Sequence, residues 1–183
     1  MIMTHSDDNG LVTPPRLAPL PVVIVPIYRD DAQMAAVVGK AREMTKGWDP
    51  LSYKIDDRDH YKPGYKFNEW ELKGIPIRIE IGPRDVENGE VVVARRDTGE
   101  KITLPMEGLR EKLDTLLDDI QANLFAVAQA RTDANTHTVD DYSEYKTRIK
   151  DGGFFRVFLD HENPEVENRL QDDTKSTVRC IPF

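Results

Sequence analysis

Two hydrophobic periods divide the first part of the chain into strands and helices. Residues 22–27 form a continuous apolar run, which is typical of a buried parallel strand. Residues 75–81 place an isoleucine at every second position, so the isoleucines should face a core while Arg78 and Glu80 face the opposite side. Turn signals at 88–89 and 97–99 accompany further predicted strands over residues 51–55, 90–96 and 101–104.

Helical spacing of apolar residues predicts three helices between and after these strands. The first begins at Asp30 or Asp31, which offer an N-cap, and ends near residue 46, before Gly47. Together with the strands on either side it would complete a right-handed βαβ unit. A short second helix is expected over about 65–73. The third, over about 107–131, carries an apolar stripe that should face the core: Leu109, Leu113, Leu116, Leu117, Ile120, Leu124 and Val127.

The two ends of the chain carry different patterns. Residues 1–20 are rich in proline and turn-forming residues and are predicted to be extended or loop. Beyond about residue 140, helices near 142–150 and 164–174 and strands near 154–159 and 177–181 predict a small α+β unit.

Composition describes a globular protein with a real core, since 39% of the 183 residues are hydrophobic and 32% are charged. No apolar run approaches the roughly 20 residues needed to cross a bilayer. The start of the chain lacks the basic and apolar regions of a signal peptide, so a cytoplasmic location is expected. The single cysteine, Cys180, excludes an internal disulfide and a four-cysteine zinc site.

The charge is unevenly distributed. A net charge of −8 argues against a general nucleic-acid coat protein. Residues 62–101 nevertheless carry eight basic and eight acidic side chains, so this segment is neutral and the rest of the chain carries the whole −8. If a polyanion binds this chain, the middle segment is the least repulsive place for it.

Two long blocks of sequence resemble one known family. Residues 3–19, MTHSDDNGLVTPPRLAP, resemble the end of the catalytic core of archaeal/eukaryotic-type prolyl-tRNA synthetases. Residues 62–85, KPGYKFNEWELKGIPIRIEIGPRD, are similar to the anticodon-domain signature of that family, and residues 95–101 and 179–183 continue the match. The resemblance implies a class II synthetase anticodon-binding fold, an α/β fold in which three helices flank a mixed five-stranded sheet. A small α+β unit would follow it.

The resemblance also implies a division of the chain and its partners. Residues 1–20 would be a remnant of the catalytic core and a linker, 21–135 the anticodon-binding domain, and 140–183 a truncated zinc-domain-like unit. The expected partners are proline tRNA, the catalytic core of the synthetase, and a second copy in a homodimeric full enzyme.

The implied site reads the two guanines that end proline anticodons. Guanine presents N7 and O6 as acceptors, which suit Arg or Lys, and N1 and N2 as donors, which suit a carboxylate. The resemblance implies that Phe67 packs on the anticodon loop, while the guanines are read by Glu71, Arg78, Arg84 and Lys101. Taken without the resemblance, Phe67 fits a core position, Glu71 a solvated helix position, and Arg78 with Glu80 a surface ion pair worth under ~1 kcal/mol. Trp70 is assigned to the core.

Departures from the family pattern limit what this chain is expected to do. The motifs that bind ATP and Mg²⁺ would lie in a catalytic core before Met1, so no catalytic residue is assigned; His5, Asp7 and Asp8 would be remnants near that site. No metal is expected either, because the first pair of zinc ligands aligns with His161 and Val166, and valine cannot ligate zinc.

Three further interpretations remain open at this point. The loop Asp56-Asp57-Arg58-Asp59-His60 has the side chains of a Mg²⁺ or Zn²⁺ site, although a solvated loop fits it better. A small enzyme that uses His60 with Asp57 or Asp59 is another possibility, but the sequence offers no nucleophile or phosphate-binding loop to support it. A stand-alone protein–protein accessory module is the main alternative to RNA binding.

Overall fold

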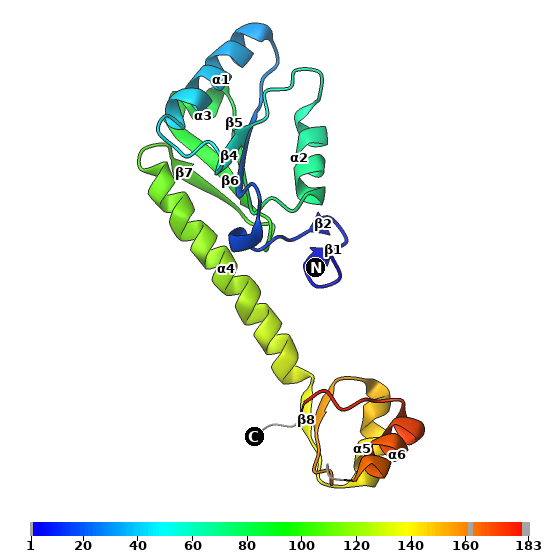
Figure 1. The fold of residues 1–183 in the computed structure, drawn as a ribbon. Helices are drawn as coiled ribbons and strands as arrows, with labels where there is room; N and C mark the ends of the chain where they lie inside the picture. Colours follow the sequence, from blue (N-terminus) through cyan, green and yellow to red (C-terminus); the bar gives the residue numbers. More distant parts are fainter. Residues whose placement is uncertain (1, 161–162, 181–183) are drawn as a thin grey trace. The chain divides into compact units, whose positions relative to one another are not determined.

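The computed structural model describes residues 2–160 and 163–180, and the chain divides into two compact units, Met1–Phe125 and Ala126–Phe183 (Figure 1). The division falls inside the long helix α4, and each unit is described by itself. Among the described residues, no helix has both the length and the apolar character needed to cross a membrane.

The first unit is built on one five-stranded sheet. In order across the sheet the strands are β4 (Tyr53–Ile55), β3 (Val22–Pro26), β5 (Ile77–Ile81), β6 (Glu90–Arg95) and β7 (Lys101–Pro105). The first three are parallel, and β6 and β7 are antiparallel to their neighbours, so the sheet is mixed as predicted. The predicted strand–helix–strand unit is β3, α1 and β4, whose two strands pair directly.

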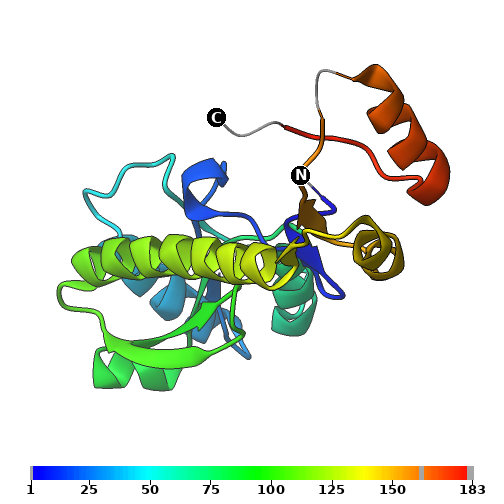
Figure 2. The ribbon, with the colours of Figure 1, turned by 90° about the horizontal axis from the view of Figure 1, so that it is seen from below.

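Helices cover the two faces of this sheet unequally (Figures 1 and 2). On one face the isoleucines of β5 pack with α1 (Asp31–Met44), α3 (Pro83–Asn88) and the first half of α4 (Leu109–Ala134). On the other face α2 (Pro63–Leu72) packs Trp70 against Val23 and Val25 of β3. The second face is therefore covered over β3 and left open towards β6 and β7, where Lys101 and Thr103 are exposed.

Local sequence explains the ends of the main helices. The carboxylate of Asp30 accepts from the backbone N–H of Gln33 at the start of α1, as its N-cap prediction requires. Pro63 occupies the first turn of α2, where its missing N–H is not needed. Gly74, with φ of +69°, follows that helix, and a Cβ there would lie 2.6 Å from the Cβ of Leu11, so the position requires glycine.

The sequence pattern did not predict one helix, because Asn88-Gly89 indicated only a turn. Residues Pro83–Asn88 form α3, with Pro83 in its first turn and Gly89 in the left-handed conformation at its end, φ +70°. The carboxylate of Asp85 accepts from the backbone N–H of Gly82 at 2.7 Å and closes the first turn. The first unit thus has four α-helices among its described residues, one more than predicted.

The predicted apolar stripe of α4 is mostly core. Leu109, Leu113, Leu116 and Ile120 are buried, and Leu117 and Leu124 pack against them. Val127 is the exception, with 60% of its surface exposed, so its assignment to the core was wrong. The helical period continues beyond the part of α4 that lies over the sheet, and for this reason the pattern alone overextends the core.

Residues 6–17 are more ordered than the predicted loop. Strands β1 (Ser6–Asp7) and β2 (Gly10–Leu11) form a hairpin, and a 3-10 turn, η1 (Pro15–Leu17), follows. Arg96 donates to both carboxylate oxygens of Asp7, at 2.6 and 2.8 Å. The hairpin is thereby fixed to the end of β6, and these bonds hold the pKa of Asp7 at about 2.

The second unit has the predicted α+β character with different strands. Helices α5 (Tyr142–Arg148) and α6 (Pro164–Thr174) form as expected, and a 3-10 turn, η2 (Ile149–Asp151), extends α5. Strand β9 is limited to Phe154–Arg156 and pairs in parallel with β8 (Thr136–Thr138), which was not predicted. No strand is found over residues 177–180; the last residue of that predicted strand, Ile181, and the zinc-position residue His161 lie outside the described residues.

Candidate functional site

Four side chains from three elements meet on the open face of the sheet. The guanidinium carbon of Arg78, on β5, lies 4.4 Å from the ring centre of Phe67, on α2. The ammonium of Lys101, on β7, lies 5.8 Å from the same ring centre. Both cations also contact the carboxylate of Glu80, at 3.1 Å and 2.8 Å. We call Phe67, Arg78, Glu80 and Lys101 the Glu80 cluster.

The strand register brings the two cations of this cluster together. Arg78 pairs with Ala94 on β6, and Ala94 pairs with Lys101 on β7, so the three lie in one row across the sheet. The methyl group of Ala94 leaves space between the two long side chains. Glu80 occupies the next row on the same face, beside Val92 of β6. One carboxylate is therefore within reach of both cations.

Glu71 lies next to this cluster, on the same side of the molecule. It is half-buried near the end of α2 and shares the lining of a small hollow with Arg78. The remaining lining residues of this hollow are Trp70, Ile75, Ala94, Arg95, Arg96 and Gly99. Within this lining the backbone carbonyl oxygen of Glu71 accepts from Nε of Arg96 at 3.3 Å, which joins the end of α2 to the end of β6. The hollow itself is small, about 30 Å³.

The two arginines at the far edge of the hollow are already paired. Arg95 donates to both oxygens of Asp97, at 3.0 and 2.8 Å, and Arg96 is held by Asp7. Burial alone would raise the pKa of Asp97, but hydrogen bonds from Arg95 and Asn123 outweigh it and lower that pKa. Arg95 pairs with Ile77 across the sheet, and Asp97 also accepts from Asn123 of α4, so the pair of Arg95 with Asp97 lies on the face covered by α4. About half of the side-chain surface of Lys101 is exposed.

Arg84 is the one predicted site residue that stands apart. It is exposed on α3, a helix that packs through Val86 on the other face of the sheet. Among the hydrogen bonds and ion pairs of residues 2–160 and 163–180, none joins Arg84 to the Glu80 cluster. The structure thus brings Phe67, Arg78 and Lys101 into one cluster, with Glu71 beside it.

Glu80 is the member of the cluster that was not among the predicted site residues. The sequence pattern placed it on the same face as Arg78, but the resemblance gave it no role. Its contact with Lys101 crosses 21 positions of sequence and depends on the register of three strands. The one signal available beforehand was its position two residues after Arg78 on an alternating strand.

A second charged cluster lies around Asp56, in the loop predicted to be solvated. The side chain of Asp56 is fully buried, accepts from Nε and Nη2 of Arg58 at 2.7 Å each, and accepts from Nε1 of Trp70 at 2.8 Å. Lys66 is also buried, and its ammonium donates to the carbonyl oxygen of Asp56 at 2.9 Å. Trp70 is in the core as predicted, while the solvated-loop prediction fails for Asp56.

The contacts of Asp56 set its protonation and its role. Burial alone would raise the pKa of Asp56, but hydrogen bonds from Arg58 and Trp70, with the nearby charge of Lys66, hold it at about 2. Burial lowers the pKa of Lys66. Among the described residues, no group of three or more His, Cys, Asp or Glu side chains is arranged to hold a metal ion. The carboxylate of Asp56, which resembled a metal ligand in the sequence, instead accepts hydrogen bonds from Arg58 and Trp70.

The enzymatic alternative rested on His60, whose side chain is mostly exposed. Its Nδ1 lies 3.2 Å from Oδ1 of Asp59, and that carboxylate is exposed as well. The hydrogen bond from His60 lowers the pKa of Asp59. His60 and Asp59 line a wide, open hollow of about 380 Å³, but both side chains stay mostly exposed to water, whereas a catalytic base needs a water-excluding site.

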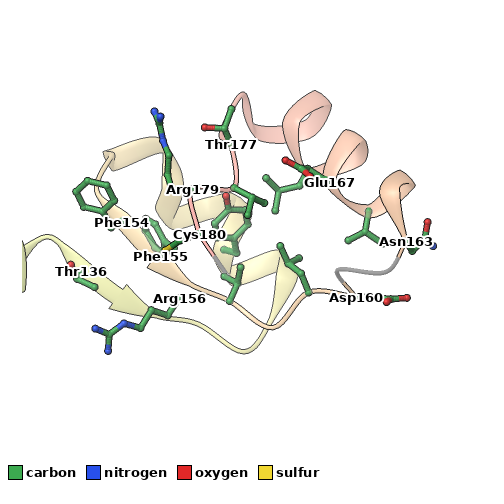
Figure 3. A pocket seen from close by; sticks show the side chains of 16 residues that line it. Thr136, Phe154, Phe155, Arg156, Asp160, Asn163, Glu167, Thr177, Arg179 and Cys180 are labelled. Carbon is green, nitrogen blue, oxygen red and sulfur yellow. The ribbon is translucent and has the colours of Figure 1, made fainter. Parts of the chain in front are cut away.

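The second unit contains an apolar hollow of about 360 Å³ (Figure 3). Five of its lining residues also form the core of that unit: Tyr145, Phe155, Val157, Leu159 and Leu170. The labelled arginines Arg156 and Arg179 extend away from it in Figure 3. The hollow continues a small hydrophobic core and lacks the convergent polar groups that the surface around Glu71 and Arg78 presents.

Comparison with known proteins identifies relatives of both units. Residues 21–116 match the family described as "Anticodon binding domain". Three curated relatives are each called "Proline--tRNA ligase": one from Porphyromonas gingivalis W83 is 50% identical, one from Chloroflexus aurantiacus J-10-fl 48%, and one from Roseiflexus castenholzii 50%. Each alignment covers 100% of this chain but only 37–38% of the relative.

Proposed function

Because the chain belongs to the anticodon-binding domain family, we propose that it binds the anticodon of proline tRNA through the open face of its five-stranded sheet. The observation that carries this proposal is the Glu80 cluster together with Glu71. An aromatic ring, two cations and two carboxylates lie on one side of the molecule, in the part of the chain that carries no net negative charge. These are the side chains that RNA loops require, because unpaired bases stack on rings and present their edges to polar groups.

We assign the contacts by the chemistry of guanine. Arg78 offers two N–H donors in one plane and suits O6 and N7, whereas Lys101 acts as a point charge on the same acceptors. Glu71 accepts from N1 and N2. Phe67 packs on the loop from the edge of its ring, because the guanidinium of Arg78 already lies over the face of that ring. Arg84 would reach the loop from α3, outside the cluster.

The proposal extends to the protein in which this surface would act. The names of the relatives support a proline–tRNA ligase, a class II enzyme that joins proline to its tRNA with ATP and Mg²⁺ in a catalytic core. This chain spans 37–38% of those relatives, and no catalytic step is assigned to its residues. A homodimeric enzyme acting in the cytoplasm is proposed with it. The resemblance of residues 62–85 supports placement in the archaeal/eukaryotic type.

Equilibrium binding of the full chain to proline tRNA tests the proposal. The reference is wild-type tRNA transcript at a stated salt concentration, and the two variants replace one anticodon guanine at a time by adenine. Adenine keeps N7 but presents an amino group in place of O6. Each replacement should weaken binding by roughly ten- to a hundredfold, which corresponds to the 1–3 kcal/mol of a good base contact.

The same titrations separate RNA reading from the main alternative. A protein–protein accessory module would bind the wild-type and substituted tRNAs, as well as an unrelated tRNA, with equal affinity. That result would overturn the proposal. A salt dependence shared by all the tRNAs is expected either way, because it reports phosphate contacts, so the test rests on the affinity ratios measured at one salt concentration.

A further inference from the structure

We infer that Glu80 is a positioning residue for guanine recognition, because its carboxylate fixes the directions in which Arg78 and Lys101 present their donors. This inference rests on the proposed function of the same surface. It adds a residue that contacts no base itself and acts through the two cations beside it.

The contacts of Glu80 account for both cations at once. Its Oε1 accepts from Nη2 and Nε of Arg78, at 3.1 and 3.3 Å. The ammonium of Lys101 lies 2.8 Å from Oε1 and 3.0 Å from Oε2. Only 8% of Glu80 is exposed, and its neighbours across the sheet are Val25 and Val92. A carboxylate beside two valines is stable there only while its counter-charges stay in place.

These bonds select which edge of Arg78 is free. A guanidinium has five N–H donors arranged around one plane. The edge formed by Nε and Nη2 faces Glu80, and one flat face lies on the ring of Phe67. The end of the group formed by Nη1 and Nη2 therefore remains for a ligand. Bidentate recognition of O6 and N7 requires two donors held in one plane, and holding them beforehand reduces the ordering cost of binding.

Loss of the carboxylate should therefore separate specificity from general attraction. Without Glu80, both long cationic side chains gain rotamer freedom and can follow phosphates instead of base edges. The face also loses one negative charge, which favours any RNA. Reduced discrimination combined with unchanged or stronger binding of unrelated tRNA is the expected signature, and simple destabilisation of the fold would not produce it.

Glu80→Gln tests the inference by removing the charge while keeping the side-chain size. Dissociation constants are measured for proline tRNA, for its two guanine-to-adenine variants and for one unrelated tRNA. We expect the discrimination ratio at the guanine read by Arg78 to fall about tenfold, while affinity for the unrelated tRNA stays the same or rises. Circular dichroism of each variant confirms that the fold is retained.

Glu90→Gln is the matched control, because it removes one charge from the same face of the sheet. Glu90 is exposed at the start of β6, and among the described residues its side chain makes no hydrogen bond or ion pair. This change should leave the discrimination ratio as in the wild type. If Glu80→Gln does not fold, Glu80→Asp keeps the charge, withdraws it by one methylene, and should give a smaller loss of discrimination.

The double variant Glu80→Gln/Arg78→Ala shows whether Glu80 acts through Arg78. In the Arg78→Ala background, loss of Glu80 should change discrimination at that guanine no further. A wild-type ratio in Glu80→Gln, with the wild-type chain discriminating normally, overturns this inference and leaves the proposed function intact. Absence of discrimination in the wild-type chain overturns both.

Discussion

Helix α2 contributes side chains to two charged clusters that are alike in composition and different in use. Each has one carboxylate, one arginine, one lysine and an aromatic ring. Around Asp56 the carboxylate is fully buried, and Lys66 is buried with it. Around Glu80 the lysine is about half exposed. The arginines differ in the opposite sense, because the side chain of Arg58 is 32% exposed and that of Arg78 only 13%. The comparison therefore indicates that a buried lysine and carboxylate serve stability, whereas a half-exposed lysine leaves donors for a ligand.

The two clusters differ in how many hydrogen-bond donors of their cationic side chains lack a partner within the protein. Asp56 accepts from Arg58 and Trp70, Arg58 also bonds Glu69, and the backbone carbonyl of Asp56 receives Lys66. In the Glu80 cluster one carboxylate serves two cations, which leaves part of each cation unpaired. The three charged residues of the Glu80 cluster sum to one positive charge, as do Asp56, Arg58 and Lys66, and Glu71 beside the Glu80 cluster offsets it.

The largest expected effect comes from the Asp56 side of this comparison. Asp56→Asn leaves the buried Lys66 without its counter-charge and Arg58 with Glu69 alone, so the free energy of unfolding should fall by about 3 kcal/mol. The corresponding change on the other side, Arg78→Ala, should lower it by only about 1 kcal/mol, because Lys101 still neutralises Glu80. Urea denaturation of both variants at neutral pH measures the two losses. Equal losses would contradict the division between a stabilising and a binding cluster.

Lowering the pH tests the same comparison through a smaller loss of stability, whose direction follows from the pKa of Asp56. The pKa of Asp56 is about 2 in the folded chain against an ordinary 3.8, so the unfolded chain takes up its proton at higher pH. The stability contribution is therefore complete above about pH 4 and is lost as the pH falls towards 2. It amounts to about 2 kcal/mol. Asp7, which is also lowered to about 2, adds a contribution of the same sign.

Denaturation of the wild type and of Asp56→Asn at several pH values isolates the pH-dependent contribution of Asp56 to stability. The stability difference between them should narrow as the pH falls from 5 to 2, because the wild-type carboxylate becomes protonated. Other acidic groups affect both proteins alike and cancel in the difference. A difference that stays constant with pH would show that Asp56 is not ionised in a stabilising pair.

Much of the fold followed from local patterns. The alternation over residues 75–81 placed Arg78 and Glu80 on one face, and the strand and helix order predicted the β3–α1–β4 unit, whereas the mixed five-stranded sheet came from the family resemblance. These features depend on period and turn chemistry, which a short stretch of sequence contains. The residue of α4 at which the core ends could not be predicted from the sequence pattern. The helical spacing of apolar residues continues through Val127, although the side chain of Val127 is exposed.

The candidate site was predictable residue by residue only in part. Phe67, Glu71, Arg78 and Lys101 came from the resemblance, and the structure adds that three of them share contacts. Glu80 and Lys66 could not be assigned from sequence, because burial of a charge depends on partners from other elements. The pair of Asp7 with Arg96 spans 89 positions, a separation that no local pattern encodes. Charged residues read as surface positions are the ones that the tertiary structure reassigned.

The central claim is that Arg78, held by Glu80 over Phe67, reads an acceptor edge of guanine. Its most direct test is binding of proline anticodon stem-loops in which 7-deazaguanine replaces one guanine at a time, which removes only the N7 acceptor. The wild-type chain should lose roughly tenfold in affinity at one position, and Arg78→Ala should show no further loss there. Equal affinity of the wild-type chain for the modified and unmodified loops at both positions would contradict the account.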